Sequence, residues 1–162
     1  MSLPARPATS TGAEVEVVCR AATSIPDLHE HHRVRHAVFV TEQGIFAPTD
    51  LDRHDGDPRT HRVLGLVDGV AAGAVRLYPL DGETGLWQGD RLAVLPEFRV
   101  HGLGGPLVRF AVRTAGELGG DVMLAHIQLP NVRFFERLGW CRDGDVEVYC
   151  GLAHQPMRIA LR

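Results

Sequence analysis

A basic residue followed by closely spaced glycines, between an apolar run and a helical pattern, constrains this chain most. The stretch is Arg91-Leu-Ala-Val-Leu-Pro-Glu-Phe-Arg99-Val-His-Gly102-Leu-Gly104-Gly105-Pro106, and an apolar helical pattern continues to Leu118. Glycines allow backbone N–H groups to crowd around an anion, and the N-terminus of a helix adds partial positive charge. The stretch therefore predicts a cradle for a diphosphate where a strand passes into a helix.

Two common phosphate-binding loops are excluded by the residues present. The stretch lacks the Gly-Lys-Ser/Thr ending of a P-loop, and all 17 basic residues of the chain are arginines. The dinucleotide pattern G-x-G-x-x-G also fails, because Leu107 occupies the place of its third glycine. The absence of lysine further excludes Schiff-base catalysis. The remaining pattern is Arg-x-x-Gly-x-Gly after a strand.

Length and composition predict one globular domain over residues 13–162, preceded by a disordered tail over residues 1–12 that is rich in Pro, Ala, Ser and Thr. The net charge of -3 gives no electrostatic reason to expect nucleic acid or an anionic membrane as a partner. Cys19, Cys141 and Cys150 lack C-x-x-C spacing, so neither a zinc site nor a disulfide framework is indicated. We expect a reduced, cytoplasmic protein.

The hydrophobic periodicity predicts an α/β domain with the element order β-α-β-β-β-α-β-α-β-β. The strands are expected at residues 14–19, 61–67, 70–78, 87–95, 121–128, 146–149 and 157–161, and the helices at 26–40, 106–118 and 131–138. Asp68-Gly69 between two apolar runs predicts a tight hairpin. The strands at 87–95 and 121–128 are joined through a helix, so we expect them to be parallel. Ligands bind where such strands part, and residues 99–105 fall at that point.

Five segments in collinear order resemble the GNAT superfamily of acyltransferases, and within it the ElaA-like branch. The likeness covers roughly Arg33 to the C-terminus. It is carried by Arg35-His-Ala-Val-Phe-Val-Thr-Glu42-Gln43, by Asp50-Leu-Asp52 with Thr60-His61-Arg-Val-Leu-Gly65, by Arg91-Leu-Ala-Val94 with Arg99-x-x-Gly102-x-Gly104, by Ala125-His126-Ile-Gln128 with Phe134-Phe135-Glu-Arg-Leu-Gly139-Trp140, and by Gly151-Leu-Ala-His154-Gln-Pro-Met157.

The resemblance implies the GNAT fold, a mixed and largely antiparallel sheet with a central splayed pair of parallel strands, flanked by helices. It implies acetyl-CoA as the acyl-donor cosubstrate, with pantetheine along the opened strand edge and the diphosphate on the glycine loop. We expect the strands to splay after Leu92 to Val94. The implied cofactor-binding residues are Leu92, Ala93, Val94, Arg99, Val100, His101, Gly102, Leu103, Gly104, Gly105 and Gln128.

One departure from the family concerns the general acid. The family often has an Asn on the late strand and, seven positions later, a Tyr that protonates the leaving thiolate. Here the same spacing links Gln128 to Phe135, which has no hydroxyl group. Either another donor serves, for which Tyr149, Cys150 and His154 are the candidates, or the thiolate leaves without help.

Two residues are candidate bases for deprotonating an amine. Asp90 lies two positions after Gln88, so both are expected to share a strand face with Leu92; the alternative is an aspartate in solvent or paired with Arg91. His126 shares a face with Gln128 and could act as a base, as imidazoles do near neutral pH; the alternative is a hydrogen-bonded core histidine.

The acceptor is predicted from an acidic segment. Glu42 and four aspartates, against two arginines, give this segment a net charge of -3, which suits a cationic amine. The alternative is a solvated loop with Glu42 paired to an arginine such as Arg35. Glu42, Asp52 and His154 are the candidate substrate-binding residues. His29, His32 and His36 follow one helical stripe but form no compact ligand motif, so we expect surface histidines and no metal.

The sequence and the resemblance together predict acetyl-CoA-dependent N-acetylation of a small amine, by direct transfer in a ternary complex. A non-catalytic acyl-CoA-binding module is one alternative, and an acyltransferase like the autoinducer synthases, with an aminoacyl sulfonium acceptor, is another. We expect neither nucleic acid nor a membrane as a partner. The sequence leaves a homodimer open.

Overall fold

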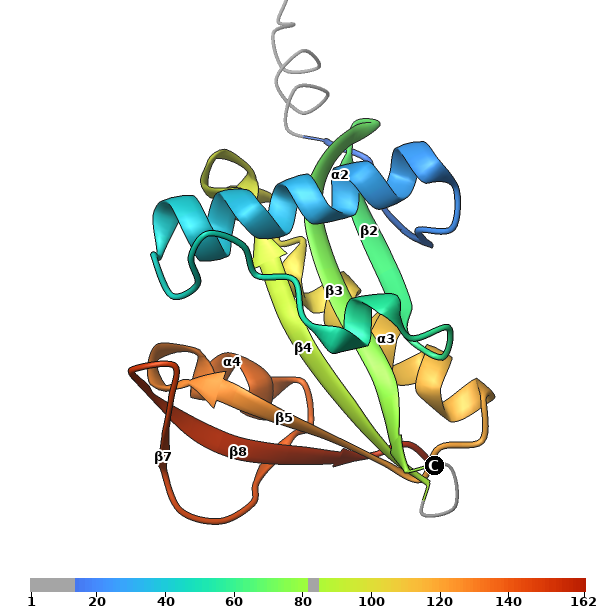
Figure 1. Cartoon of the computed structure of the whole chain (residues 1–162). Helices are drawn as coiled ribbons and strands as arrows, with labels where there is room; N and C mark the ends of the chain where they lie inside the picture. The colour runs from blue at the N-terminus through green and yellow to red at the C-terminus, as the bar shows by residue number, and fades with distance from the viewer. Residues whose placement is uncertain (1–13, 82–84) are drawn as a thin grey trace, which may run out of the picture.

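One mixed sheet carries the fold, with α2 on one of its faces and α3 on the other (Figure 1). The computed structural model describes residues 14–81 and 85–162, so the tail expected over residues 1–12 lies outside the described residues. The strands follow the order β1-β2-β3-β4-β5-β8-β6, and β7 pairs with β8. They are β1 (Val17–Ala21), β2 (His61–Val67), β3 (Val70–Asp81), β4 (Leu86–Val94), β5 (Val122–Gln128), β6 (Cys141–Arg142), β7 (Glu147–Tyr149) and β8 (Leu152–Ala160).

Helix α2 (Ile25–Arg35) begins where the sequence predicts a cap. The side chain of Ser24 accepts a hydrogen bond from the backbone N–H of Asp27 (3.2 Å), and Pro26 stands in the first turn. The helix passes into a π-helical segment, His36–Glu42. The remaining helices are the 3₁₀ turns Arg53–Gly56, Pro96–His101 and Leu129–Asn131, the long α3 (Gly104–Glu117) and the short α4 (Val132–Arg137).

The β2–β3 hairpin confirms the turn predicted from Asp68-Gly69, since both residues have positive φ (49° and 79°). Glycines on these two strands also position the glycine loop. A Cβ atom on Gly73 would lie 2.7 Å from Leu103, and one on Gly65 would lie 3.1 Å from the same side chain. The bare backbone at these positions lets Leu103 sink into the core, which fixes the start of α3 against the sheet.

The parallel pair predicted from the sequence is confirmed, and it is short. Strand β4 pairs with β5 only over Leu86–Gln88 and Val122–Leu124. Beyond that point β4 stays with β3, whereas β5 stays with β8 as far as Gln128. The two strands therefore diverge as a V (Figure 1). The expectation that they splay after Leu92–Val94 is wrong, because the last paired residues are Gln88 and Leu124.

The C-terminal strands differ most from the prediction. Strand β8 begins at Leu152 rather than at residue 157, and the two-residue strand β6 has no counterpart among the expected elements. The side chains of residues 152–153 are exposed, yet their backbone pairs with β7 across a turn. In the described part of the chain, no helix has the length and apolar character needed to cross a membrane.

Candidate active site

The V between β4 and β5 opens into a cavity of about 310 Å³. Its walls come from both arms of the V, from the π-helical end of α2, from α3 and α4, and from the β7–β8 hairpin. Beyond Gln88 and Leu124, no strand in the described part of the chain lies between the facing backbone groups of β4 and β5. An extended ligand could therefore pair with these edges as a further strand would.

The glycine loop lies at the open end of β4, beside this cavity. After the 3₁₀ turn Pro96–His101, Gly102 takes a left-handed conformation (φ 68°) and the chain enters α3 at Gly104. Among the described residues, no side chain caps the N-terminus of α3. Its first N–H groups are thus available to an anion, and the helix dipole favours one there. This geometry fits a diphosphate on the backbone of residues 102–105.

The side chains of the glycine loop and of the end of β4 differ in whether they can contact a ligand. Leu103 is buried in the core, so only its backbone can meet a ligand, whereas Val100 is 84% exposed. On β4, Ala93 is buried on the α2 side, and Leu92 and Val94 pack against the core cluster on the α3 side. Of the three, Leu92 lines the cavity.

The structure brings together two residues that the sequence assigned to different ligands, Arg99 and Glu42. The guanidinium of Arg99 donates to both carboxylate oxygens of Glu42 (2.8 and 2.6 Å) and to the carbonyl oxygen of Val94 (2.9 Å). The Arg99 guanidinium lowers the pKa of Glu42, which stays ionised at neutral pH. Glu42 is therefore neither free in solvent nor paired with Arg35, and it ties α2 to the glycine loop.

A β-bulge reorders the side chains of β4. Asp90 lies opposite Arg76 and Ala93 opposite Ala74, so β4 has one extra residue, and Arg91 has a positive φ of 53° at this point. The extra residue places both Asp90 and Arg91 against the ion pairs on the α2 side, while Leu92 packs on the α3 side. The expectation that Asp90 shares a face with Leu92 is therefore wrong.

Asp90 lines the cavity, but both of its oxygens are engaged. They accept hydrogen bonds from Nε and Nη2 of Arg76 (2.8 and 2.7 Å), and the Tyr78 hydroxyl donates to Oδ2 at 3.3 Å. Both alternatives considered for this residue, a free carboxylate and a pair with Arg91, are replaced by this pair with Arg76. Asp90 would have to give up a hydrogen bond from Arg76 or Tyr78 before it could contact the amine of an acceptor.

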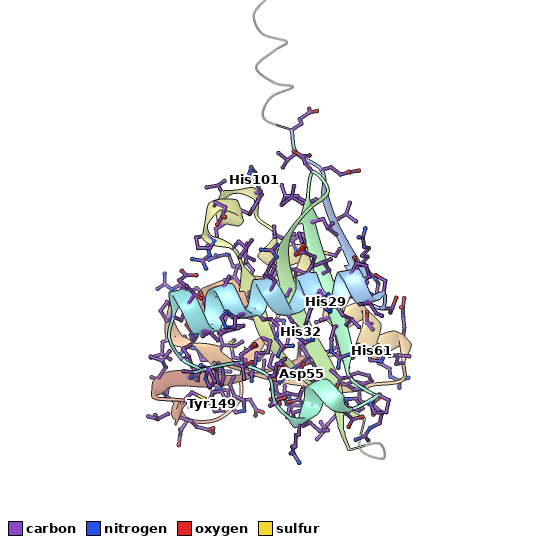
Figure 2. All side chains as sticks on the ribbon, turned by 45° about the horizontal axis from the view of Figure 1, so that its top comes forward. His29, His32, Asp55, His61, His101 and Tyr149 are labelled. Carbon is purple, nitrogen blue, oxygen red and sulfur yellow. The ribbon has the colours of Figure 1, made fainter. Side chains whose placement is uncertain are left out.

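Buried arginines on α2 and on the sheet neutralise most of the acidic segment. Arg35 binds Asp50 (2.7 Å) and Asp55 (2.7 and 3.0 Å), and both charges lie out of solvent. Burial opposes the ionisation of Asp55, but the hydrogen bonds from Arg35 hold its pKa well below the usual value. Figure 2 shows Asp55 on the side of the sheet that α2 covers.

Asp52, the candidate substrate-binding residue of this segment, belongs to the same network. It caps the turn Arg53–Gly56 and accepts hydrogen bonds from Arg76 (2.7 and 3.0 Å) and from Arg91 (3.4 Å). Asp57 pairs with Arg59, outside the network. The prediction of an acidic rim for a cationic amine is wrong, because each carboxylate of the segment has an arginine partner.

His31 is hydrogen-bonded next to this network. Its burial predicts that the protein loses stability in mild acid. Its ring is fully buried, with Nδ1 2.9 Å from the carbonyl oxygen of Val63 and Nε2 3.3 Å from Nη1 of Arg35, a donor. Burial lowers the pKa of His31 to about 3, and Arg35 adds to this effect. Below the unfolded-state pKa of about 6.5, the unfolded chain binds a proton that the fold excludes, so stability falls as the pH falls.

We expect the free energy of unfolding to decrease by about 1.4 kcal/mol per pH unit between about pH 6 and pH 4 on account of this residue. Urea titrations of the wild type and of His31→Gln at several pH values measure it, since the variant lacks the group. Identical pH slopes for the two proteins would contradict a neutral, buried His31.

The rim of the cavity carries titratable groups from β5 and the β7–β8 hairpin. His126 is 42% exposed, and its Nδ1 lies 3.9 Å from a carboxylate oxygen of Glu147. Tyr149 stacks on His126 (5.8 Å between ring centres) and meets His154 edge-on (5.4 Å). Figure 2 shows Tyr149 on the hairpin side of the molecule. His126 is thus a rim residue and not a hydrogen-bonded core histidine.

Tyr149 lines the cavity together with Arg91 of β4. Partial burial raises the pKa of its hydroxyl, although the guanidinium of Arg91 on β4 pulls it down. His154 is buried, with Nδ1 2.9 Å from the carbonyl oxygen of Leu152, and Gln128 donates to Gln43 at 3.2 Å. Phe135, at the place of the family's Tyr, is buried edge-on against Trp140 (5.3 Å).

The three histidines of the predicted helical stripe do not line this cavity. His29 and His32 lie on α2 (Figure 2), and with His36 they border a second, shallow hollow beside Thr49. Within the described ranges 14–81 and 85–162, no three His, Cys, Asp or Glu side chains come together as metal ligands would.

Comparison with known proteins agrees with the fold and the site described above. The model of the acetyltransferase (GNAT) family aligns with residues 25–140. A Bacillus subtilis (strain 168) protein, provisionally named an acetyltransferase, is 31% identical over 135 residues, which cover 82% of this chain and 88% of that protein.

Solved structures share the fold. Escherichia coli ElaA superimposes with a TM-score of 0.76 and 21% identity, over 90% of this chain and 99% of that one. BjaI, a CoA-dependent acyl-homoserine lactone synthase solved with SAM and isopentyl-CoA, superimposes with a TM-score of 0.73 and 19% identity, over 92% of this chain and 84% of that one.

Proposed function

The chain belongs to the acetyltransferase (GNAT) family and is an acyltransferase, and from this premise we propose that it transfers an acetyl group from acetyl-CoA to a small amine. The transfer is direct, within a ternary complex and without a covalent enzyme intermediate. The observation that carries this proposal is the V between β4 and β5, which opens beside the uncapped N-terminus of α3.

The donor is held by backbone groups more than by side chains. The N–H groups of residues 102–105 bind the diphosphate, and the free edges of β4 and β5 pair with pantetheine. Acetyl-CoA supplies an activated acyl group as a thioester. Arg99 is tied to Glu42 and Val94, so its charge keeps the loop in place and offsets the diphosphate charge nearby.

The acceptor approaches from the rim, and His126 takes the proton of its amine. This exposed imidazole lies on the β5 arm of the V and has no buried ion pair to break before it accepts a proton. Asp90 is the other candidate base, and both of its oxygens accept hydrogen bonds from Arg76. We therefore propose that Asp90 positions Arg76 and the β4 bulge. Because the carboxylates of the acidic segment are paired with arginines, we expect no strong preference for a highly charged acceptor.

Tyr149 is proposed as the proton donor to the leaving thiolate, in place of the hydroxyl that Phe135 lacks. Its raised pKa keeps the phenol protonated at neutral pH, and the ring stacks on His126 and lines the cavity together with Arg91. We expect Tyr149→Phe to lower kcat about 100-fold, because the ring keeps its stacking partner and only the hydroxyl is lost. Thiol release with acetyl-CoA and an accepted amine measures this, alongside the Kd for acetyl-CoA, which should not change.

Cys150→Ser is the matched comparison, since Cys150 follows Tyr149 in the same turn and is also exposed. It should keep kcat within about threefold of the wild type. A large loss in Cys150→Ser with little change in Tyr149→Phe would transfer the role to the thiol.

An acyl transfer of the autoinducer-synthase kind is the second candidate, because the fold of BjaI aligns over nearly all of this chain. An aminoacyl sulfonium acceptor, accepted in preference to simple amines, would favour it. Release of CoA thiol across a panel of small amines with acetyl-CoA tests the first proposal. Absence of release with every amine, although acetyl-CoA binds, would contradict N-acetylation. The reduced cytoplasm is the proposed compartment, supported by three free cysteines, and the homodimer stays a prediction.

A further inference from the structure

The cavity in the V has two chemically different ends. Its rim carries the polar side chains of Gln43, Asp90, Arg91, His126 and Gln128. Its floor, where β4 and β5 meet, extends to the α3 side of the sheet and is apolar. The floor is formed by Val75 of β3, Ala111 of α3, Met123 and Ala125 of β5, Phe135 of α4 and Trp140 after it.

The apolar floor is more than the space between packed side chains. Its residues belong to the main core cluster and are themselves buried, yet they line the same continuous cavity as the rim. Two small residues, Ala111 and Ala125, leave room where larger side chains would close the floor.

An acetyl group does not use this space. The thioester has to lie near the rim, where His126 and Tyr149 can reach it, so a two-carbon acyl group ends close to the polar side chains. A longer chain that continues from the same carbonyl carbon would enter the floor between Met123 and Ala111. Nothing charged lines this part of the cavity, so an apolar chain would meet only apolar surface and the indole edge.

We propose that the floor of the V is an acyl-chain subsite, and that acyl-CoA donors of about four to eight carbons bind more tightly than acetyl-CoA. This inference rests on the proposed function, since it takes the V as the acyl-CoA site. It extends the donor class from acetyl to medium-chain acyl groups.

Calorimetric titration of the full chain with acetyl-, butyryl-, hexanoyl- and octanoyl-CoA tests the subsite without needing the acceptor. Burial of each added methylene group should lower Kd about fourfold until the floor is filled. Equal or weaker binding of the longer thioesters would overturn the subsite. Absence of binding for every thioester, acetyl-CoA included, would instead refute the proposed function.

Substitutions of residues on the floor test where the acyl chain of the donor binds. Ala125→Val adds two methyl groups at the floor on a strand that favours valine, and should remove most of the gain from the longer chains while the Kd of acetyl-CoA stays within about threefold. Ala111→Leu makes the same test from α3. Ala72→Val is the matched control, because Ala72 is a fully buried strand residue of the same cluster away from the cavity. If both floor variants fold by circular dichroism and keep the wild-type chain-length dependence, the chain lies elsewhere and the subsite is wrong.

Discussion

Replacing Arg35 by methionine should lower the free energy of unfolding by about 3–5 kcal/mol, because it removes a fully buried guanidinium that two buried carboxylates share. Arg35 is 0% exposed and holds Asp50 and Asp55 with three hydrogen bonds of 3.0 Å or less. Methionine fills a similar volume, so the loss comes from charge and not from a cavity. Urea unfolding at neutral pH measures it.

Arg33→Met is the matched control on the same helix. Arg33 pairs with Glu30 on the surface, with half of its side chain exposed, so its removal should cost less than about 1 kcal/mol. Similar losses in the two variants would show that the buried network contributes no more than a surface pair. A selective loss in Arg35→Met would also help to explain why the long segment between α2 and β2 is ordered, since two of its aspartates, Asp50 and Asp55, bind this guanidinium.

Gly104→Trp should abolish measurable binding of acetyl-CoA, an increase in Kd of at least about 100-fold. Gly104 is the first residue of α3, at the N–H groups that we assign to the diphosphate. A Cβ atom there would already lie 3.3 Å from the tip of the Phe134 ring, so an indole has to occupy the space of the ligand or displace Phe134. Calorimetry with acetyl-CoA measures the loss, with thermal unfolding as the check on the fold.

Gly104→Ala separates bulk from backbone freedom at the same position. Gly104 does not need a positive φ, and a methyl group requires a shift of only a few tenths of an ångström at the flexible end of Phe134. We therefore expect Gly104→Ala to keep Kd within about fivefold of the wild type. Retained affinity in Gly104→Trp would move the diphosphate away from this loop.

Local signals in the sequence account for much of the fold. Neighbouring residues in the sequence determine three features that the structure has. These are the turn at Asp68-Gly69, the glycine loop before α3 and the apolar periodicity of α3. The family model over residues 25–140 confirms the resemblance and the fold class. The second half of β8 was also predicted, but its start was not, because its partner β7 is known only once the turn at Cys150 and Gly151 is formed.

The site was harder to predict, because long-range pairing decides it. One extra residue at Arg91 turns Asp90 toward Arg76, and nothing in the alternation of β4 indicates a bulge. The buried network left a weak signal: Arg76 stands in a largely apolar strand, and four aspartates lie in the segment before β2. Arginines in apolar runs need carboxylate partners, and this rule could have predicted that the acidic segment is neutralised.

A crystal structure of the chain with acetyl-CoA tests the central claim most directly. We predict the diphosphate on the backbone of residues 102–105, pantetheine along β4 between Gly89 and Val94, and the thioester within the V, facing His126 and Tyr149. Acetyl-CoA bound outside the V, or with its diphosphate away from the N-terminus of α3, would contradict the account.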